Sequence, residues 1–225
     1  MCGRYSLIEL PDGIELIPPD EGHPAHRVQY NIAPTHLCPV IPMHDPGHAY
    51  LYRWGLVPPW AKDIKMGYKM INARAETLDI KPAFRDPVRK NRCLVLADGF
   101  YEWKQTSTGK QPYRITLKSK KVFTFAGLSD TWMSPEGKKV HTFTIITTEP
   151  NELMVDIHDR MPVILDPVAG QSWLNPQIEI EEALNLLRPY QANLMKAYPV
   201  SPSVGNVKID SEELIRPFEP PPTLF

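Results

Sequence analysis

Long apolar runs, an excess of one charge and a cysteine framework are all missing from this sequence. No apolar stretch approaches the roughly 18 residues that a membrane-spanning helix needs, so we expect no membrane partner. The formal net charge is −1, whereas nucleic-acid-binding domains are often strongly basic. A nucleic-acid partner would therefore require a local basic groove. The start MCGRYSLIEL contains no apolar secretory signal, and we expect a cytoplasmic protein.

Metal-binding patterns are also absent. The three cysteines, Cys2, Cys38 and Cys93, are odd in number and form no C-x-x-C pair, which argues against a disulfide framework and a cysteine zinc site. His44 and His48 are four residues apart, but the Asp-Pro-Gly between them breaks any helix that would align them. We therefore expect no metal and no cofactor.

The sequence motifs of several common enzyme classes are also absent. The chain has no phosphate-binding G-x-x-x-x-G-K-S/T loop, no dinucleotide-binding G-x-G-x-x-G and no zinc-peptidase H-E-x-x-H. It also lacks the G-x-S-x-G nucleophile elbow of serine hydrolases.

The residues that are present describe a globular chain with many turns. Hydrophobic residues make up 42% of the 225 residues, enough for a core, and 25 prolines with 12 glycines predict short elements joined by ordered loops. We expect one domain over residues 1–217 and a proline-rich, extended tail over residues 218–225. We also expect loops at Leu16–Pro24 and His44–His48.

Alternating and β-branched segments predict more strands than helices. The expected strands are Leu37–Met43, Ala49–Leu56, Cys93–Ala97, Phe100–Gln105, Tyr113–Leu117, Val122–Leu128, His141–Thr147 and Pro162–Leu165. The expected helices are Ala83–Lys90, Asn151–Ile157, Asp166–Leu174 and Ile178–Leu187. This pattern predicts an α+β fold with a mainly antiparallel, curled or barrel-like sheet and short flanking helices.

Cys2 is the first candidate for chemistry. Methionine is generally removed before a small second residue, which would leave Cys2 with a free α-amine and a thiol on neighbouring carbons. An α-amine has a pKa near 7.7–8.0, so an appreciable fraction of it is nucleophilic at cellular pH. Such a 1,2-aminothiol condenses with an aldehyde to an imine and then to a five-membered thiazolidine. On position alone, an incidental small residue after methionine is the simpler explanation.

Three further segments contain polar groups suited to a site. Asn72, Arg74 and Glu76 alternate and would share one face of an extended segment, although a solvated strand edge fits equally well. Glu102 lies between two aromatic residues that could shield it from water. Burial would raise the pKa of its carboxyl group towards values that are useful for general acid–base catalysis, although an exposed strand glutamate is commoner. His158 can exchange protons near neutrality, and Arg160 can hold a phosphate, but such residues are as often structural.

Aromatic and basic residues supply the elements of a nucleic-acid surface. Trp54, Trp60, Trp103 and Tyr101 could stack on unpaired bases, although most tryptophans lie in cores. The cations that could follow a phosphate backbone are Arg4, Arg74, Arg89, Lys90, Arg92, Arg160 and Lys208.

Seven short motifs occur together and in a fixed order. They are Met1-Cys2-Gly3-Arg4-Tyr5, Tyr30-Asn31-Ile32-Ala33-Pro34, Trp54-Gly55-Leu56-Val57-Pro58, Asn72-Ala73-Arg74-Ala75-Glu76-Thr77, Asp98-Gly99-Phe100-Tyr101-Glu102-Trp103-Lys104, Asp156-Ile157-His158-Asp159-Arg160-Met161-Pro162 and Val204-Gly205-Asn206-Val207-Lys208. In this combination the chain resembles the SOS response-associated peptidase (SRAP) family, also called abasic-site processing proteins. The likeness extends from Cys2 to about Pro217. An aromatic that follows Trp60 in the family is replaced here by Ala61.

This resemblance implies a covalent function in the DNA damage response. The expected partner is single-stranded DNA with an abasic site, and the expected product is a thiazolidine crosslink between Cys2 and the ring-opened sugar. The resemblance assigns catalytic roles to Cys2, Asn72, Glu102 and His158. It assigns DNA contacts to Arg4, Asn31, Pro34, Trp60, Arg74 and Arg160. It also implies lyase chemistry through the imine, autoproteolytic exposure of Cys2, and association with the nucleoid at damaged DNA.

Two other functions stay open at this point. Cys2 with His158 as its base would also suit a cysteine peptidase. A non-catalytic DNA-binding module, in which Cys2 is incidental, is the third alternative. We expect a monomer in each case.

Overall fold

The computed structural model describes residues 2–18, 28–119 and 121–219. Their strands are β1 (Tyr5–Leu7), β2 (Glu15–Ile17), β3 (Gln29–Ile32), β4 (Leu37–Pro42), β5 (His48–Trp54), β6 (Asn72–Arg74), β7 (Arg92–Ala97), β8 (Gly99–Thr106), β9 (Gly109–Leu117), β10 (Phe123–Met133), β11 (Lys139–Thr148), β12 (Met161–Pro162), β13 (Ile164–Leu165) and β14 (Met195–Pro199). The α-helices are α1 (Pro87–Lys90), α2 (Pro167–Leu174) and α3 (Ile180–Asn185). Short 3₁₀ turns η1 (Ile64–Lys69) to η5 (Glu212–Ile215) complete the set.

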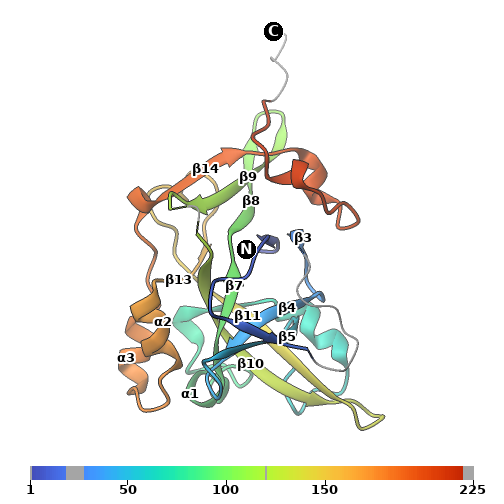
Figure 1. Ribbon diagram of the computed structural model, residues 1–225, viewed down its shortest axis with the longest axis vertical. Helices are drawn as coiled ribbons and strands as arrows, with labels where there is room; N and C mark the ends of the chain where they lie inside the picture. Colours follow the sequence, from blue (N-terminus) through green and yellow to red (C-terminus); the bar gives the residue numbers. More distant parts are fainter. Residues whose placement is uncertain (1, 19–27, 120, 220–225) are drawn as a thin grey trace.

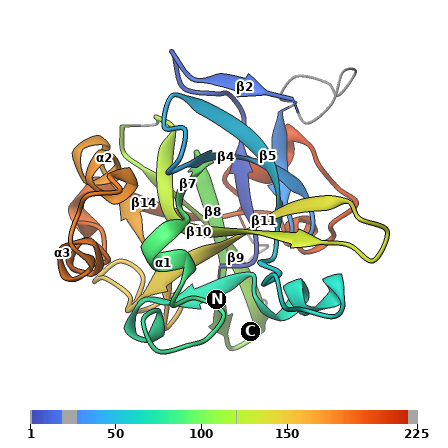
Figure 2. The same cartoon turned by 90° about the horizontal axis from the view of Figure 1, so that it is seen from below.

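Five strands close into a small barrel. The order β5-β4-β7-β10-β11 is antiparallel throughout, and β11 returns to β5 through a parallel pairing at Thr142↔Arg53 and Phe143↔Trp54. All six residues of β7 are buried, because the strand lies in the middle of this sheet. Figure 2 shows the barrel from below, with α1 and α2 outside it. The expected α+β fold with a barrel-like antiparallel sheet is confirmed.

A second sheet lies above the barrel in Figure 1. Its strand order is β14-β9-β8-β1-β3, and β8 enters it directly from β7 of the barrel. The N-terminal segment pairs with β8, with Tyr5 opposite Phe100 and Ser6 opposite Gly99. This pairing brings the start of the chain to the junction of the two sheets.

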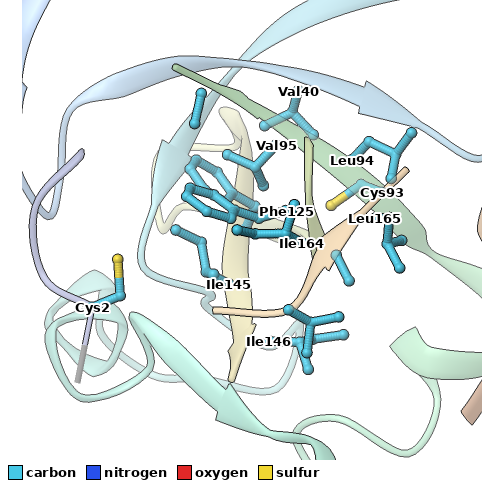
Figure 3. Packing of buried hydrophobic residues seen from close by; sticks show 14 of the residues in the cluster. Cys2, Val40, Cys93, Leu94, Val95, Phe125, Ile145, Ile146, Ile164 and Leu165 are labelled. Atoms are coloured by element: carbon cyan, nitrogen blue, oxygen red, sulfur yellow. The ribbon is translucent and has the colours of Figure 1, made fainter. Parts of the chain in front are cut away.

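The barrel is filled by large apolar side chains. Trp54 and Phe143 stack with ring centroids 6.3 Å apart, and Tyr5 meets Trp54 edge-on. Figure 3 shows Cys93 among Leu94 and Leu165, while Cys2 lies at the edge of the buried cluster. Cys2 is therefore packed against the core and yet close to the junction of the sheets.

Only the helix expected at Asp166–Leu174 has nearly its predicted length. Helix α2 begins after Asp166, whose carboxylate accepts hydrogen bonds from the amides of Val168 and Ala169 at 2.9 Å. The predicted helix Asn151–Ile157 is wrong: Asn151 does accept hydrogen bonds from the amides of Leu153 and Met154, but only successive turns follow. The predicted helices over residues 83–90 and 178–187 contract to α1 and α3, since the flanking residues form turns.

Strand predictions were more accurate than helix predictions, with gaps at short strands. The strands expected at Val122–Leu128 and His141–Thr147 are longer, because β10 and β11 continue as a hairpin beyond the barrel. The strand expected at Pro162–Leu165 is divided between β12 and β13. The short strands β1, β2, β3, β6 and β14 were not predicted, and too few residues in each show alternation.

Two predicted irregular segments need correction at their edges. The loop expected from Leu16 begins inside β2, and residues 19–24 of that prediction lie outside the described residues. Residues 220–225 of the expected tail also lie outside them. Phe218 is tied to the domain, because its amide donates to the carbonyl oxygen of Pro199 at 2.9 Å. Among the described residues, no helix is long and apolar enough to cross a membrane.

Gly55 offers a test of barrel closure. Its φ is +116°, and a Cβ there would lie 2.6 Å from the carbonyl oxygen of Gly67. Its amide also donates to the carbonyl oxygen of Phe143 on β11 at 2.8 Å. We expect Gly55→Ala to lower the free energy of unfolding in urea by about 3 kcal/mol, because backbone must move.

Gly109 is the matched control for this substitution. Its φ is +128°, but a Cβ would meet nothing within 4 Å. Gly109→Ala should cost only about 1 kcal/mol, the conformational part of the penalty. Equal losses at the two glycines would contradict the crowding at Gly55.

Candidate active site around Cys2

Cys2 is held in place by backbone contacts from two sides. The amide of Tyr101 donates to the carbonyl oxygen of Arg4 at 2.9 Å, which extends the β1–β8 pairing towards the N-terminus. Asn72 Nδ2 donates to the carbonyl oxygen of Cys2 at 2.8 Å. The Cys2 side chain has no exposed surface, and its Sγ lies 3.8 Å from the Arg4 carbonyl oxygen. The backbone of this residue is thus fixed at a defined place beside β8.

Burial makes the Cys2 thiol a weak acid. Desolvation raises its pKa far above the ordinary value, and the negative charge of Glu102 raises it further. At neutral pH the sulfur carries its proton. This differs from the electropositive surroundings that give peptidase cysteines a reactive thiolate.

Glu102 is a buried carboxyl group poised near neutrality. It belongs to β8, and only 2% of its surface is exposed. Desolvation raises its pKa from 4.5 to about 7. Both the acid and the carboxylate are therefore populated at cellular pH, which is the condition for a group that accepts and returns a proton. The expected burial of Glu102 is confirmed, but its neighbours Tyr101 and Trp103 do not cause it. They belong to a separate apolar cluster, because successive side chains of a strand point to opposite faces.

His158 faces Glu102 from the loop between β11 and β12. Its Nε2 lies 3.8 Å from Glu102 Oε2. Its Nδ1 accepts a hydrogen bond from the Arg160 amide at 3.0 Å and lies 2.8 Å from Asp159 Oδ1. Nδ1 therefore has the Arg160 amide and the Asp159 carboxylate as neighbours, and Nε2 is the ring nitrogen that faces Glu102. Burial lowers the pKa of His158, which favours its neutral form.

Asn72 reaches the site from the opposite direction. Strand β6 pairs in parallel with β11, which sets Asn72 opposite Ile145 and directs its amide to Cys2. Asn72 Oδ1 is buried and has no hydrogen-bond partner among the described residues. It is an acceptor that a substrate hydroxyl or a transient N–H can use. The four residues expected to be catalytic therefore meet at one place.

The residues expected to bind DNA fall into two groups. Arg4 and Asn31 are occupied inside the protein: Arg4 Nη1 donates to Asn31 Oδ1 at 2.9 Å and to the carbonyl oxygen of Val204 at 3.0 Å. Asn31 is 1% exposed and donates to the carbonyl oxygen of Ile209 at 2.8 Å. Both brace the chain around η4 (Pro202–Gly205), and their contact with DNA stays a prediction.

The residues of the second group range from exposed to mostly enclosed. Trp60 is 58% exposed, and Arg74 is exposed. Pro34 is half-buried in the turn after β3, beside Thr35, whose φ of +79° is unusual for a β-branched residue. Arg160 is mostly enclosed and paired with Glu76. Arg92 and Trp54, also named as candidates, are buried in the core and are too enclosed to contact DNA.

The alternation over Asn72, Arg74 and Glu76 holds only in part. Asn72 and Arg74 belong to β6, but Glu76 lies in the 3₁₀ turn η2 (Ala75–Thr77). The three side chains therefore do not share one strand face. Asn72 turns to Cys2, and Glu76 turns to Arg160.

The sequence patterns did not predict the buried ion pair between Asp98, which precedes β8, and Arg114 on β9. Arg114 Nη2 donates to Asp98 Oδ1 at 2.8 Å, and Ser6 Oγ donates to the same oxygen at 2.6 Å. A Cβ on Gly99 would lie 2.7 Å from the Arg114 guanidinium, which explains the glycine after Asp98. The available signal was a single cation, Arg114, within the predicted strand Tyr113–Leu117.

No group of three or more His, Cys, Asp or Glu residues within the described ranges is arranged to hold a metal ion. The three cysteines are free thiols, and all are buried.

Comparison with known proteins identifies relatives of this chain. A family profile described as "SOS response associated peptidase (SRAP)" matches residues 1–207. The abasic site processing protein YoqW of Bacillus subtilis is 50% identical over 225 residues, covering 96% of this chain and 99% of its own. The chicken abasic site processing protein HMCES is 39% identical over 192 residues, which cover 74% of this chain and 56% of its own.

Solved structures agree with the fold. A crystal structure of a protein from Bacteroides thetaiotaomicron has a TM-score of 0.74 and 34% identity, covering 78% of this chain and 79% of its own. A protein from Bordetella bronchiseptica has a TM-score of 0.76 and 26% identity, covering 89% of this chain and 100% of its own.

The raised pKa of Glu102 predicts a pH-dependent cost of folding. The folded protein keeps the Glu102 proton up to about pH 7, whereas the unfolded chain releases it near 4.5. Stability contributed by this group therefore falls as pH rises between these values. At about pH 8, Glu102→Gln should be more stable than the wild type by about 3 kcal/mol, and at about pH 4 the difference should vanish.

Urea denaturation at both pH values measures this difference. Glu149→Gln, which changes an exposed carboxylate, is the control and should show no such pH dependence. A Glu102→Gln variant that is equally stable or less stable than the wild type at the higher pH would contradict the assigned burial cost.

Proposed function

Because the chain belongs to the SOS response associated peptidase (SRAP) family, we propose that it processes abasic sites in DNA by covalent capture at Cys2. The observation that carries the proposal is the meeting of Cys2, Asn72, Glu102 and His158 at one buried place. The names of the relatives YoqW and HMCES, both abasic site processing proteins, support the substrate.

The proposed reaction begins once Met1 has been removed. The Cys2 amine attacks the aldehyde carbon of the ring-opened sugar, water leaves, and an imine forms. The Cys2 sulfur then adds to the imine carbon while its proton passes to the nitrogen. The product is a thiazolidine, in which one carbon of the sugar is bonded to both nitrogen and sulfur. An internal cysteine cannot follow this route, because its nitrogen belongs to an amide.

The surrounding residues match the proton movements of this reaction. With a pKa of about 7, Glu102 can accept a proton from the attacking amine and return it to the departing oxygen. The protonated state of the Cys2 thiol suits a sulfur that adds late, after a base takes its proton. His158, neutral and facing Glu102, is placed to assist these transfers and their reversal. Asn72 orients the Cys2 backbone and offers Oδ1 to the substrate.

Single-stranded DNA is the proposed form of the substrate. An abasic sugar can reach a buried group such as Cys2 only if its strand is free to bend into the site. Exposed Trp60 offers a stacking face, and exposed Arg74 offers a phosphate contact next to Asn72. We further propose that the protein acts as a monomer in the cytoplasm and that it associates with the nucleoid at damaged DNA.

A cysteine peptidase is the second candidate. The family description and the neighbouring His158 favour it. The buried, protonated Cys2 thiol argues against turnover of added peptides, since thiolate is the nucleophile in such enzymes. Self-removal of Met1 and strand cleavage through the imine are compatible with the same residues.

The test separates the amine of Cys2 from its thiol. Wild-type protein is mixed with a single-stranded oligonucleotide that contains one abasic site, and adducts are resolved on a denaturing gel. We expect a stable adduct without any reductant. Cys2→Ser and Cys2→Ala keep the α-amine, so they should give an adduct only when borohydride traps the imine.

Controls define the outcomes of this experiment. Protein mass must show that Met1 is absent from all three proteins, and an intact oligonucleotide should give no band. If Cys2→Ala formed as much adduct as the wild type in the absence of borohydride, the proposal would be wrong. Peptide turnover that is lost in Cys2→Ala would favour the peptidase, and unchanged DNA behaviour in that variant would favour a non-catalytic binding module.

A further inference from the structure

Arg160 was expected to hold a phosphate, but its guanidinium is already occupied. Nη1 donates to Glu76 Oε1 at 2.6 Å, and Nη2 donates to Glu76 Oε2 at 3.0 Å. Nη2 also donates to the carbonyl oxygen of Thr147 at 2.7 Å. Two parallel bonds between a guanidinium and a carboxylate form the strongest and most directional kind of protein ion pair. The guanidinium N–H groups that would bind a phosphate are therefore already bonded to the Glu76 carboxylate.

The pair is more enclosed than an ordinary surface ion pair. The Arg160 side chain is 14% exposed and that of Glu76 is 52% exposed. Arg160 Nε is buried and has no hydrogen-bond partner among the described residues. The carboxylate that pairs with this guanidinium is that of Glu76. The Arg160 hydrogen bond lowers the pKa of Glu76 and keeps its carboxylate ionised.

Arg160 joins three segments that are distant in sequence. Through its side chain it contacts η2 at Glu76 and the end of β11 at Thr147. Through its backbone amide it donates to His158 Nδ1 at 3.0 Å. The residue that receives the ion pair is thus the one whose backbone amide contacts the His158 ring.

We propose that Glu76 is a positioning residue for His158, acting through Arg160. Its carboxylate fixes the guanidinium, the guanidinium fixes the loop of residues 149–160 against β11, and the Arg160 amide then holds the imidazole towards Glu102. The inference rests on the proposed function, because it assigns Glu76 a part in the covalent reaction at Cys2. Glu76 itself is bonded to Arg160, so it acts on the reaction only through that residue.

Loss of the carboxylate has a clear physical consequence. Arg160 would keep only the Thr147 carbonyl oxygen as an acceptor, and an enclosed cation without a counter-charge moves towards water. That movement would shift the Arg160 amide, and with it the 3.8 Å separation between His158 Nε2 and Glu102 Oε2. Proton transfer responds steeply to such displacements.

The test compares Glu76→Gln with Glu149→Gln. Both variants remove one exposed or half-exposed carboxylate, but only Glu76 contacts Arg160. On an abasic single-stranded oligonucleotide we expect Glu76→Gln to form the crosslink about tenfold more slowly than the wild type. Its Kd for an intact oligonucleotide should match that of Glu149→Gln within about twofold, since both lose the same charge.

Two backgrounds separate positioning from general weakening of the fold. In a His158→Ala background, Glu76→Gln should cause no further loss of rate, because the group that it positions is gone. In an Asn72→Ala background, the same substitution should still slow the reaction about tenfold. A further loss in the His158→Ala background would overturn the inference in favour of a structural role.

The remaining outcomes distinguish this inference from the proposed function. Absence of a wild-type crosslink would defeat the proposed function itself. A wild-type crosslink with an unchanged rate for Glu76→Gln would defeat only the role of Glu76. Tighter DNA binding by Glu76→Gln than by Glu149→Gln, with no loss of rate, would also overturn the inference and show that Glu76 instead shields Arg160 from phosphate.

Discussion

The antiparallel pairing of the N-terminal segment with β8 is the contact on which the site depends. Tyr5 and Ser6 pair with Phe100 and Gly99, and the Arg4 carbonyl oxygen accepts from the Tyr101 amide. Asp98 stabilises this pairing, because its carboxylate accepts hydrogen bonds from Ser6 Oγ and from the Ile8 amide, both at 2.6 Å. Sheet pairing thus holds Cys2 beside Glu102. Once Met1 is removed, as we propose, the same pairing would hold the α-amine and the thiol of Cys2 there together.

Burial is the second requirement, and it has opposite effects on the groups involved. It raises the pKa of Cys2 and of Glu102, and it lowers the pKa of His158. Each shift favours the neutral form, as a poorly solvated site demands. A site of neutral acids and bases can pass protons among an amine, an oxygen and a sulfur without stabilising a permanent thiolate. This electrostatic character is better suited to reversible addition at an aldehyde than to peptide hydrolysis.

The sequence was informative where one residue determines its own surroundings. The Asp166 cap before proline and the long strands of the barrel both follow from local patterns. Glu102 is buried as expected, although its aromatic neighbours pack elsewhere. The sequence was less informative where distant partners decide. Asn151 caps a turn that never becomes a helix, and Glu76 leaves the strand pattern to meet Arg160 from the far side of β11. Arg4 and Asn31 likewise serve contacts with residues some 170 to 200 positions away, which no local pattern contains.

The position of the new bonds tests the central claim most directly. The adduct with abasic single-stranded DNA would be treated with iodoacetamide, digested with nuclease and trypsin, and sequenced by tandem mass spectrometry. The account predicts a sugar remnant on the peptide that begins at Cys2, with the amine blocked and the thiol resistant to alkylation, as a thiazolidine requires. A remnant on a lysine, or on Cys2 with an alkylated thiol, would contradict it.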